Sequence, residues 1–424
     1  MSLAENFCSS PWFHMQITAN GKYQYCRWAR PTEDSQYQHP LEFFQQGMGT
    51  IRQQLLAGEL PQDCEQCKVM EQHNKVSGRQ RQLLKTGIVL GRFEKTLVSS
   101  TFFEKFKQSH GTGSTDLKPV DWQIHLGNFC NSGCVFCTPD ASSRLAQEFV
   151  KLKIISTAPR HTWTDDTQQI DQFIELLANT PNLAYLHFIG GETLITPAFG
   201  VILQRMIDAG VASRISIGFT TNLTVWRQEI VDLLVQFREV NLGMSVECLD
   251  SVNDYVRWPS QIITVQSIMD QWIKLSRSHG WITTLRVTPT CLTVSRLLSV
   301  YQYAYHEQIG VESCNFLEDP AHLRINVLPL GIRNSIADSF ETWIAQQSST
   351  GEQVINTRDP NQARDSVLQD AASYVNYLRT AHDETHRLAD LIRYLKLLET
   401  SSHNLLLDKN RCSQAGKKDK KHYL

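Results

Sequence analysis

Strand and helix patterns alternate from about residue 120 to 318, and this alternation constrains the fold more than any other feature. Short apolar runs that predict strands lie at Val120–Leu126, Ala184–Ile189, Ile215–Thr221, Val240–Glu247, Thr283–Thr288 and Glu312–Phe316. Helical spacing of apolar residues indicates helices between them, over 170–177, 197–207, 229–237, 262–275 and 294–309. Strands that alternate with helices of this length predict parallel βαβ units. We expect an α/β fold with a partial or full barrel, and a functional site at the carboxyl ends of its strands.

The composition is that of an ordinary globular protein. The 424 residues suggest two or three domains, and 41% are hydrophobic and 20% charged. The formal net charge of −2 creates no field that favours nucleic acid or an acidic membrane. We see no run of eighteen apolar residues and no secretory signal at the start. The sequence therefore predicts a cytoplasmic protein without a membrane or nucleic-acid partner.

Eleven cysteines are more than a core needs. An odd number in a chain without a secretory signal argues against a disulfide framework, so thiolates that bind metal are the better interpretation. The cysteines fall into two groups and four single positions, which are Cys248, Cys291, Cys314 and Cys412.

The stretch NFCNSGCVFC places Cys130, Cys134 and Cys137 in a C-x3-C-x2-C array after the first predicted strand. A structural zinc site usually has four ligands with C-x2-C pairs, and no histidine follows closely here. A four-iron cluster with three protein thiolates leaves one iron open to bind a substrate or cofactor directly. The cluster is the favoured interpretation, with structural zinc as the alternative.

This array, with Phe136 before the last cysteine, resembles the signature of the radical S-adenosylmethionine (radical SAM) enzymes. The resemblance implies that the open iron chelates the amino and carboxylate groups of S-adenosylmethionine. An electron from the cluster then cleaves the sulfonium C–S bond, and the 5′-deoxyadenosyl radical abstracts hydrogen from a substrate. The family's partial (β/α)6 TIM-type barrel agrees with the strands counted above. The resemblance also implies a reductant such as flavodoxin or ferredoxin.

Further positions match motifs of the same family. Gly190, Gly191 and Glu192 in HFIGGET resemble the motif that binds the methionine amino group, although a plain strand-to-helix turn is the alternative. Asn222, Ser245 and Glu247 resemble ribose-binding positions, where an aspartate is more usual than Glu247. Arg257 resembles an arginine that pairs with the methionine carboxylate, with a surface arginine as the alternative. Adenine contacts are expected near Val287–Thr290.

The second group comprises Cys8, Cys26, Cys64 and Cys67. Asn20-Gly21 predicts a hairpin over Ile17–Tyr25, and Cys8 and Cys26 flank it. A four-cysteine zinc site is one interpretation. The spacing Cys8, Gly21, Cys26 and then C-x2-C also resembles the twitch domain, a short form of the SPASM domain of radical SAM enzymes, although Arg27 departs from the common pattern. The resemblance implies one auxiliary, fully ligated four-iron cluster that moves electrons or shapes the pocket.

These features divide the chain into five parts. We expect a twitch domain over 1–75, a connecting segment over 76–119, the radical SAM barrel over 120–330, a helical region over 331–415 and a disordered tail over 416–424. The lysines and arginines of 75–95 are expected on a solvated helix face, with RNA or peptide contact as the alternative. Leu388, Leu391, Ile392, Leu395 and Leu398 form an apolar helical stripe that we expect in the core.

Three functions remain open at this point. The first is a radical SAM maturase that epimerises, oxidises or cross-links a ribosomally made peptide. The second is a dehydrogenase or epimerase of a small molecule such as an amino sugar, and the third is a non-enzymatic iron–sulfur or zinc protein. Cys248, Cys291 and Cys314 are expected to be core residues, although one of them could donate hydrogen to a substrate radical.

Overall fold

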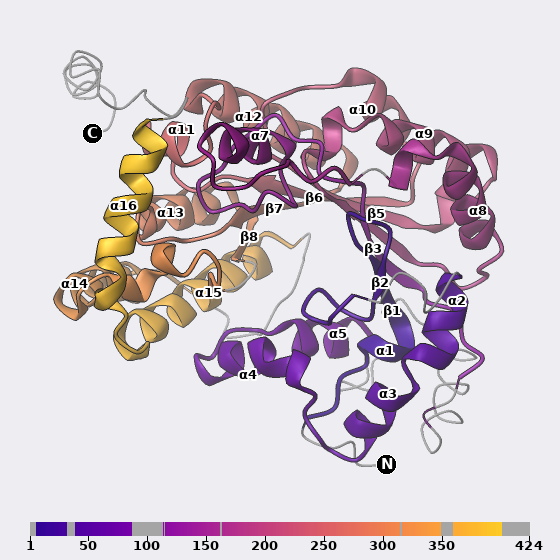
Figure 1. The fold of residues 1–424 in the computed structure, drawn as a ribbon, viewed down its shortest axis with the longest axis horizontal. Helices are drawn as coiled ribbons and strands as arrows, with labels where there is room; N and C mark the ends of the chain where they lie inside the picture. Colours follow the sequence, from indigo (N-terminus) through magenta and orange to yellow (C-terminus); the bar gives the residue numbers. More distant parts are fainter. Residues whose placement is uncertain are drawn as a thin grey trace.

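The structure is a computed structural model, and it describes residues 6–31, 39–86, 113, 115–161, 163–313, 316–348 and 359–400. One sheet runs through the molecule, and helices lie around it (Figure 1). Its strand order is β2-β1-β3-β4-β5-β6-β7-β8. All neighbouring strands pair in parallel except β1 and β2. In the described chain β8 pairs only with β7, so the sheet is consistent with an open partial barrel.

The six strands predicted from the sequence are present. They are β3 (Asp121–His125), β4 (Tyr185–Ile189), β5 (Ser216–Thr221), β6 (Glu239–Ser245), β7 (Ile282–Val287) and β8 (Gly310–Ser313). Only β8 departs clearly from its expected range, since it begins two residues before the predicted Glu312 and ends at Ser313. The predicted alternation of strands and helices is confirmed.

The helices predicted between the strands are confirmed as α8 (Thr167–Ala178), α9 (Pro197–Asp208), α10 (Gln228–Leu234), α12 (Ile262–His279) and α13 (Leu297–Glu307). Two further helices, α7 (Ser143–Lys151) and α11 (Val252–Val256), were not predicted. One face of the sheet packs on them through aromatic side chains. Trp122 meets Phe173 of α8 with ring centroids 5.5 Å apart, and Phe219 meets Trp272 of α12 at 5.6 Å. This layer between sheet and helices is the apolar core.

The other face of the sheet carries polar side chains, including Gln123, His187 and Arg286. Two glycines on this face make room for them. A Cβ on Gly218 would lie 2.0 Å from the Tyr185 hydroxyl, and one on Gly243 would lie 2.9 Å from Arg286 Nε. Large polar side chains therefore fill the concave side of the sheet.

The N-terminal segment extends the same sheet. After α1 (Ser10–Phe13), the predicted hairpin is confirmed as β1 (His14–Ile17) and β2 (Tyr23–Gln24), although it begins at His14. Gly21 in its turn has φ +79°, a conformation that favours glycine. Strand β1 pairs in parallel with β3, so the hairpin continues the barrel sheet.

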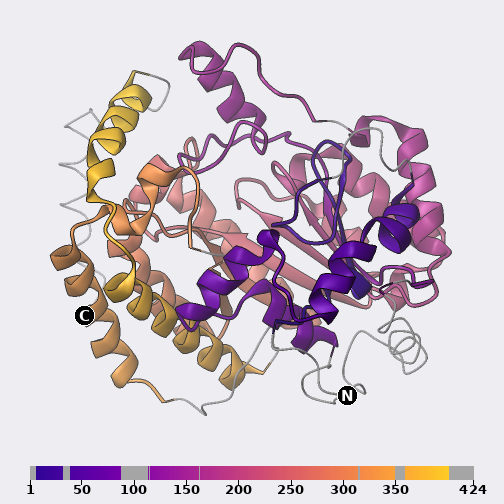
Figure 2. The ribbon, with the colours of Figure 1, turned by 60° about the horizontal axis from the view of Figure 1, so that its bottom comes forward.

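Further N-terminal helices follow the hairpin. They are α2 (Pro40–Glu42), a π-helix (Phe43–Gly47), α3 (Gly49–Leu56), α4 (Glu65–Gln72) and α5 (Gly78–Thr86). Figure 2 shows this part of the chain lying across the strands, on the side that is turned forward there. Buried Arg52 joins α3 to α1, because its Nη2 donates a hydrogen bond of 2.7 Å to the carbonyl of Pro11.

The C-terminal region is helical where it is described. It contains α14 (Leu330–Ala345), α15 (Pro360–Thr380) and α16 (Leu388–Glu399), and α15 packs against both α14 and β8. On α16, Leu391 and Leu398 are buried but Ile392 is 52% exposed, so only part of the predicted stripe lies in the core. Cys314, Cys412, the expected tail and residues 87–95 of the basic segment lie outside the described residues. In the described part of that segment the expected solvated face is wrong, because Lys75 is buried against Asp370 and the Arg79 and Arg81 side chains are only 13% and 20% exposed.

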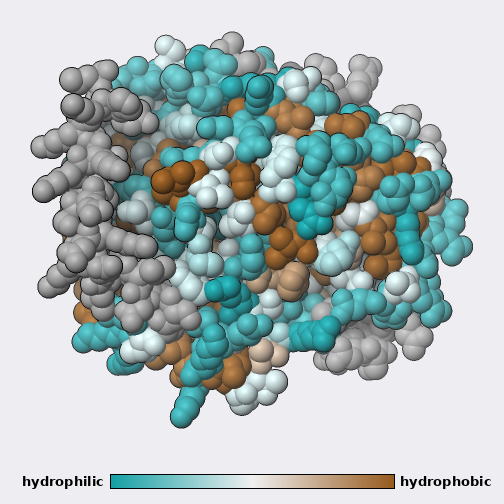
Figure 3. Space-filling view, turned by 90° about the horizontal axis from the view of Figure 1, so that it is seen from above, coloured by the Kyte–Doolittle hydropathy of each residue, from teal (hydrophilic) through white to brown (hydrophobic). Residues whose placement is uncertain are grey.

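Apolar side chains on the face seen from above gather in several separate patches among hydrophilic ones (Figure 3). Within the part of the chain that is described, no helix is both long and apolar enough to cross a membrane.

Candidate active site

The loop that carries Cys130, Cys134 and Cys137 joins β3 to α7, at the carboxyl end of β3. Asn128 fixes its first half. Its Nδ2 donates a hydrogen bond of 2.8 Å to the carbonyl of Pro159, and its own carbonyl accepts one of 2.7 Å from the Ser143 amide. Asn128 is buried, so these bonds are shielded from water. Sequence reasoning missed this residue.

Backbone hydrogen bonds to the last residue of α11 and to the residues that follow it fix the second half of the cysteine loop. The Gly133 amide donates to the Trp258 carbonyl at 2.7 Å, and the Val135 amide donates to the Val256 carbonyl at 2.9 Å. From α16, the Tyr394 hydroxyl donates to the Val135 carbonyl at 2.7 Å. The cysteine loop is therefore held between the barrel and the C-terminal helix.

The three thiols lie close enough to influence one another. Burial raises the pKa of each thiol, to about 12 for Cys137, and the Cys134 thiol raises the pKa of both Cys130 and Cys137 further. The Ser132 amide lies 3.4 Å from Cys130 Sγ, and Arg257 Nη1 lies 3.9 Å from Cys134 Sγ. Crowded, buried thiols with cationic and N–H donors beside them suit thiolate ligands of an iron cluster, whose positive iron ions favour deprotonation.

Gly190 and Gly191 lie against this loop, and their backbones have φ +113° and +48°. A Cβ on Gly191 would lie 1.9 Å from the carbonyl oxygen of Phe129, and one on Gly190 would lie 2.7 Å from that of Gly127. The Glu192 amide donates to the Phe129 carbonyl at 2.9 Å. The two glycines thus permit close approach of β4 to the cysteine loop.

Glu192 is almost fully buried, and three donors of the chain reach its carboxylate. Oε1 accepts hydrogen bonds from Thr221 Oγ1 at 2.7 Å and the Leu194 amide at 3.1 Å, while Oε2 accepts one from the Asn222 amide at 2.6 Å. A carboxylate offers about four acceptor positions, so one on Oε2 remains for another donor.

Asn222 joins β5 to the cysteine loop. Its Nδ2 donates to Asn131 Oδ1 at 2.8 Å and to Ser132 Oγ at 3.0 Å, and its Oδ1 accepts from Thr224 Oγ1 at 2.6 Å. Each polar group of this side chain therefore has a partner in the chain. The structure places Asn222 at the expected strand end, where it holds the loop.

Glu247 and Arg257 form a buried ion pair. Oε1 of Glu247 accepts from Arg257 Nη2 at 2.6 Å and Nε at 3.2 Å, and Oε2 accepts from the Thr288 amide at 2.7 Å. The motifs predicted that Glu247 contacts the ribose and that Arg257 contacts the methionine carboxylate. They did not predict that the two side chains pair with each other. Phe136 lies beside the pair, with the Arg257 guanidinium 5.3 Å from its ring centroid.

Ser245 differs from these neighbours. It is the last residue of β6 and is 9% exposed, and its hydroxyl forms no hydrogen bond to the described residues. Of the ribose positions expected from the sequence, Ser245 keeps its polar group available, whereas Asn222 and Glu247 are hydrogen-bonded within the protein.

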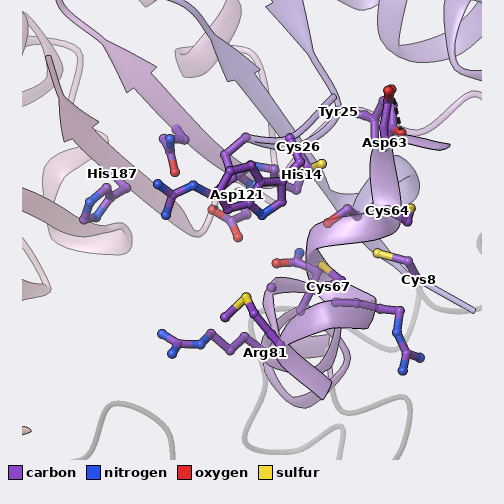
Figure 4. A pocket seen from close by; sticks show the side chains of 18 of the residues that line it. Cys8, His14, Tyr25, Cys26, Asp63, Cys64, Cys67, Arg81, Asp121 and His187 are labelled. Atoms are coloured by element: carbon purple, nitrogen blue, oxygen red, sulfur yellow. Dashed lines mark hydrogen bonds and ion pairs between the residues drawn. The ribbon is translucent and has the colours of Figure 1, made fainter. Parts of the chain in front are cut away.

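The second cysteine group comes together around one pocket (Figure 4). Cys8 precedes α1, Cys26 follows β2, Cys64 ends a short 3-10 helix and Cys67 lies in α4. Burial, with a smaller contribution from the Cys67 thiol, raises the pKa of Cys8 to about 11. Burial, with contributions from the Cys8 and Cys67 thiols, raises the pKa of Cys64 to about 12. The four residues are well separated in the sequence yet face a common space.

This pocket has a volume of about 180 Å³, and all four thiols line it. Such a space is several times the roughly 30 Å³ that one water molecule takes in the liquid, so it suits an inorganic cluster. In the described chain, no three His, Cys, Asp or Glu side chains are grouped around a position for a single metal ion. The pocket also reaches Tyr185, His187 and Arg286 on the concave face of the sheet.

The single cysteines are buried where they are described. Cys248 is fully buried shortly after β6, and Cys291 lies after β7 with its thiol 3.7 Å from the His322 carbonyl. No disulfide joins any of the nine described cysteines. A hydrogen-donor role for Cys248 or Cys291 stays a hypothesis.

A family model for the radical SAM superfamily matches residues 124–288. No curated protein matches the chain. Among solved structures, the chain is similar to Streptococcus suis SuiB bound to precursor peptide SuiA, with 12% identity and a TM-score of 0.37 over 62% of this chain and 59% of that one. It is also similar to native anSMEcpe with bound AdoMet, with 15% identity and a TM-score of 0.39 over 54% and 61% of the two chains.

A third similar structure is the radical S-adenosylmethionine methyltransferase TsrM from Kitasatospora setae, with 14% identity and a TM-score of 0.32 over 44% of this chain and 32% of that one. In each of these three structures the chain covers less than two thirds of the other protein's length. Likenesses of this strength support no conclusion about substrate or reaction.

Proposed function

Because residues 124–288 form a radical SAM superfamily domain, we propose that this chain is a radical SAM enzyme with two four-iron clusters. One observation supports the catalytic cluster above all. Cys130, Cys134 and Cys137 meet at the carboxyl end of β3, inside the matched segment, and Glu192, Asn222 and Arg257 contact the same loop. When bound, such a cluster with S-adenosylmethionine supplies a 5′-deoxyadenosyl radical.

Arg257 and Glu192 are proposed to hold the two ends of the methionine moiety. Arg257 uses Nε and Nη2 on Glu247, and its Nη1 is directed toward Cys134, so Nη1 can donate to a carboxylate beside the cluster. Glu192 keeps one acceptor position on Oε2 for an ammonium group. The Gly190-Gly191 turn and Asn222 hold Glu192 against the cysteine loop, and Glu247 holds Arg257.

Ser245 is proposed to bind the ribose, because its hydroxyl has no partner in the described chain. Glu247 is proposed to act through Arg257, since that guanidinium donates two of the three hydrogen bonds that its carboxylate accepts. Phe136 is proposed to support Arg257 from one side.

The N-terminal segment is proposed to be a twitch domain with an auxiliary cluster on Cys8, Cys26, Cys64 and Cys67. The support is the shared pocket of these thiols and the hairpin between Cys8 and Cys26. Four thiolates fill the four iron positions of such a cluster. The cluster is therefore proposed to transfer electrons or to shape the pocket rather than to bind substrate.

Iron content tests the two-cluster proposal. Anaerobically reconstituted protein should carry about eight irons, and the variant with Cys130, Cys134 and Cys137 all changed to Ala should carry about four. That variant should form no 5′-deoxyadenosine from S-adenosylmethionine. The matched control is Cys248→Ala, which should keep about eight irons.

Two outcomes would oppose the proposal. Full 5′-deoxyadenosine formation by the triple variant would remove the catalytic cluster from this loop. About four irons and one zinc in the unmodified protein would assign the N-terminal cysteines to a structural zinc site.

A further inference from the structure

Three charged side chains form a triad beside the pocket of the N-terminal thiols. Arg286 of β7 pairs with Glu312 of β8, with Nη1 2.6 Å from Oε2. Arg81 of α5 contacts the other oxygen of the same carboxylate. All three residues line the pocket that Cys8, Cys26, Cys64 and Cys67 line, and Figure 4 shows Arg81, Cys67 and His187 around it.

The triad carries excess positive charge away from bulk water. Two guanidinium groups share one carboxylate, and the side chains of Arg81, Glu312 and Arg286 are only 20%, 15% and 19% exposed. The fold makes room for this arrangement, since a Cβ on Gly243 would lie 2.9 Å from Arg286 Nε. A charge held in a region of low dielectric acts strongly on its neighbours.

A four-iron cluster on four thiolates is negatively charged, and reduction adds one more negative charge. Net charge close to a cluster is among the main determinants of its reduction potential. We propose that the Arg81–Glu312–Arg286 triad raises the reduction potential of the auxiliary cluster. This inference rests on the proposed function, because it requires a cluster on the N-terminal cysteines.

A purely structural role is the competing explanation. Arg81 belongs to the N-terminal segment and Glu312 to the last barrel strand, so the triad also joins the two parts of the chain. The direction of the change in reduction potential distinguishes the two explanations. Removing the Arg81 cation should lower the reduction potential, whereas removing the Glu312 carboxylate should raise it, although both changes break the Arg81–Glu312 ion pair.

Potentiometric titration followed by electron paramagnetic resonance tests the triad. Arg81→Gln should make one-electron reduction of the auxiliary cluster about tenfold less favourable, which corresponds to about 59 mV, and Glu312→Gln should shift it in the opposite direction. Arg81→Lys should keep the potential of the unmodified protein. Arg393→Gln is the control, because Arg393 lies on α16 and its side chain is 78% exposed. The potential of the catalytic cluster should stay unchanged in every variant.

Several results would overturn the inference. Two results obtained with about eight irons bound would leave the triad a structural link only. One is an equal reduction potential of the auxiliary cluster in all variants, and the other is a shift of the same sign in Arg81→Gln and Glu312→Gln. If Arg81→Gln does not retain its cluster, the sign of the potential shift in Glu312→Gln and the unchanged potential expected for Arg81→Lys still test the inference. About four irons in the unmodified protein would instead refute the auxiliary cluster itself, and the triad's role with it.

Discussion

Glu192 is the residue whose ionisation should control cofactor binding. Burial raises its pKa to about 6, an effect only partly offset by the Asn222 amide, the Thr221 hydroxyl and the Leu194 amide. An ammonium partner favours the ionised carboxylate. Below pH 6 the carboxyl must therefore lose a proton before it can pair, so affinity for S-adenosylmethionine should fall about fivefold from pH 6 to pH 5 and change little above pH 7. Anaerobic calorimetry at each pH would measure this affinity.

Glu192→Gln is the matched control for that pH profile. The amide cannot ionise, so binding by this variant should be weaker by about one to two decades and independent of pH over the same range. Its iron content should match that of the unmodified protein. Equal affinity in the two proteins would place Glu192 outside the cofactor site.

Gly191 provides a second prediction at this scale. A Cβ there would lie 1.9 Å from the Phe129 carbonyl, in a backbone with φ +48°. Gly191→Ala should therefore displace the loop beside Cys130, and the protein should lose about four irons and a few kcal/mol of unfolding free energy. Gly331→Ala is the control, since no atom lies within 4 Å of the added methyl position. Normal iron content in Gly191→Ala would contradict the prediction.

Sequence spacing predicted that Cys130, Cys134 and Cys137 share one loop after the first strand, because all three lie within eight consecutive positions. It did not predict that Glu247 pairs with Arg257, since that contact depends on how α11 turns the chain between them. Tyr394 was missed for a similar reason. It donates to Val135, which is 259 positions away, and no local pattern signals such a bond.

At the scale of elements, α16 stabilises the cysteine loop through Tyr394. Tyr394→Phe removes the hydrogen bond of 2.7 Å to the Val135 carbonyl and should cost about 1 kcal/mol. The loosened loop should lose iron faster in air, which absorbance near the cluster band would follow. Tyr303→Phe is the control, because it removes an exposed hydroxyl bond of 3.3 Å to Asp270 on another part of the barrel. Equal rates of iron loss would show that α16 does not protect the loop.

Periodicity predicted the barrel elements well because each strand is bounded by a long amphipathic helix. It could not predict where the N-terminal hairpin docks. Strand β1 has four residues, and its partner β3 begins at Asp121, far along the chain. That pairing follows from the packing of buried residues such as Trp12 and Phe13, which a single-sequence pattern does not encode.

At the scale of the whole molecule, the open sheet bears on the substrate. Strand β8 pairs only with β7 among the described strands, so the sheet is consistent with an open partial barrel, and α15 packs against β8. The pocket of the N-terminal thiols reaches Gln123, Tyr185, His187 and Arg286 on the polar face of the sheet, where Tyr185 bonds His187 and Arg286 pairs with Glu312. We propose that a peptide binds between the N-terminal segment and the open side of the barrel, where this pocket meets the sheet.

The peptide proposal predicts a specific mass change. The reduced enzyme should be incubated in deuterated water with S-adenosylmethionine and candidate peptides, and residue masses and stereochemistry followed. Deuterium at one Cα with inverted configuration would identify epimerisation, and loss of two hydrogens would identify oxidation or cross-linking. The triple variant at Cys130, Cys134 and Cys137 should leave every peptide unchanged, because it lacks the proposed catalytic ligands. Turnover seen only with an amino sugar or another small molecule would overturn the peptide proposal but leave the radical SAM assignment intact, since the latter depends on the cysteine loop and not on the substrate.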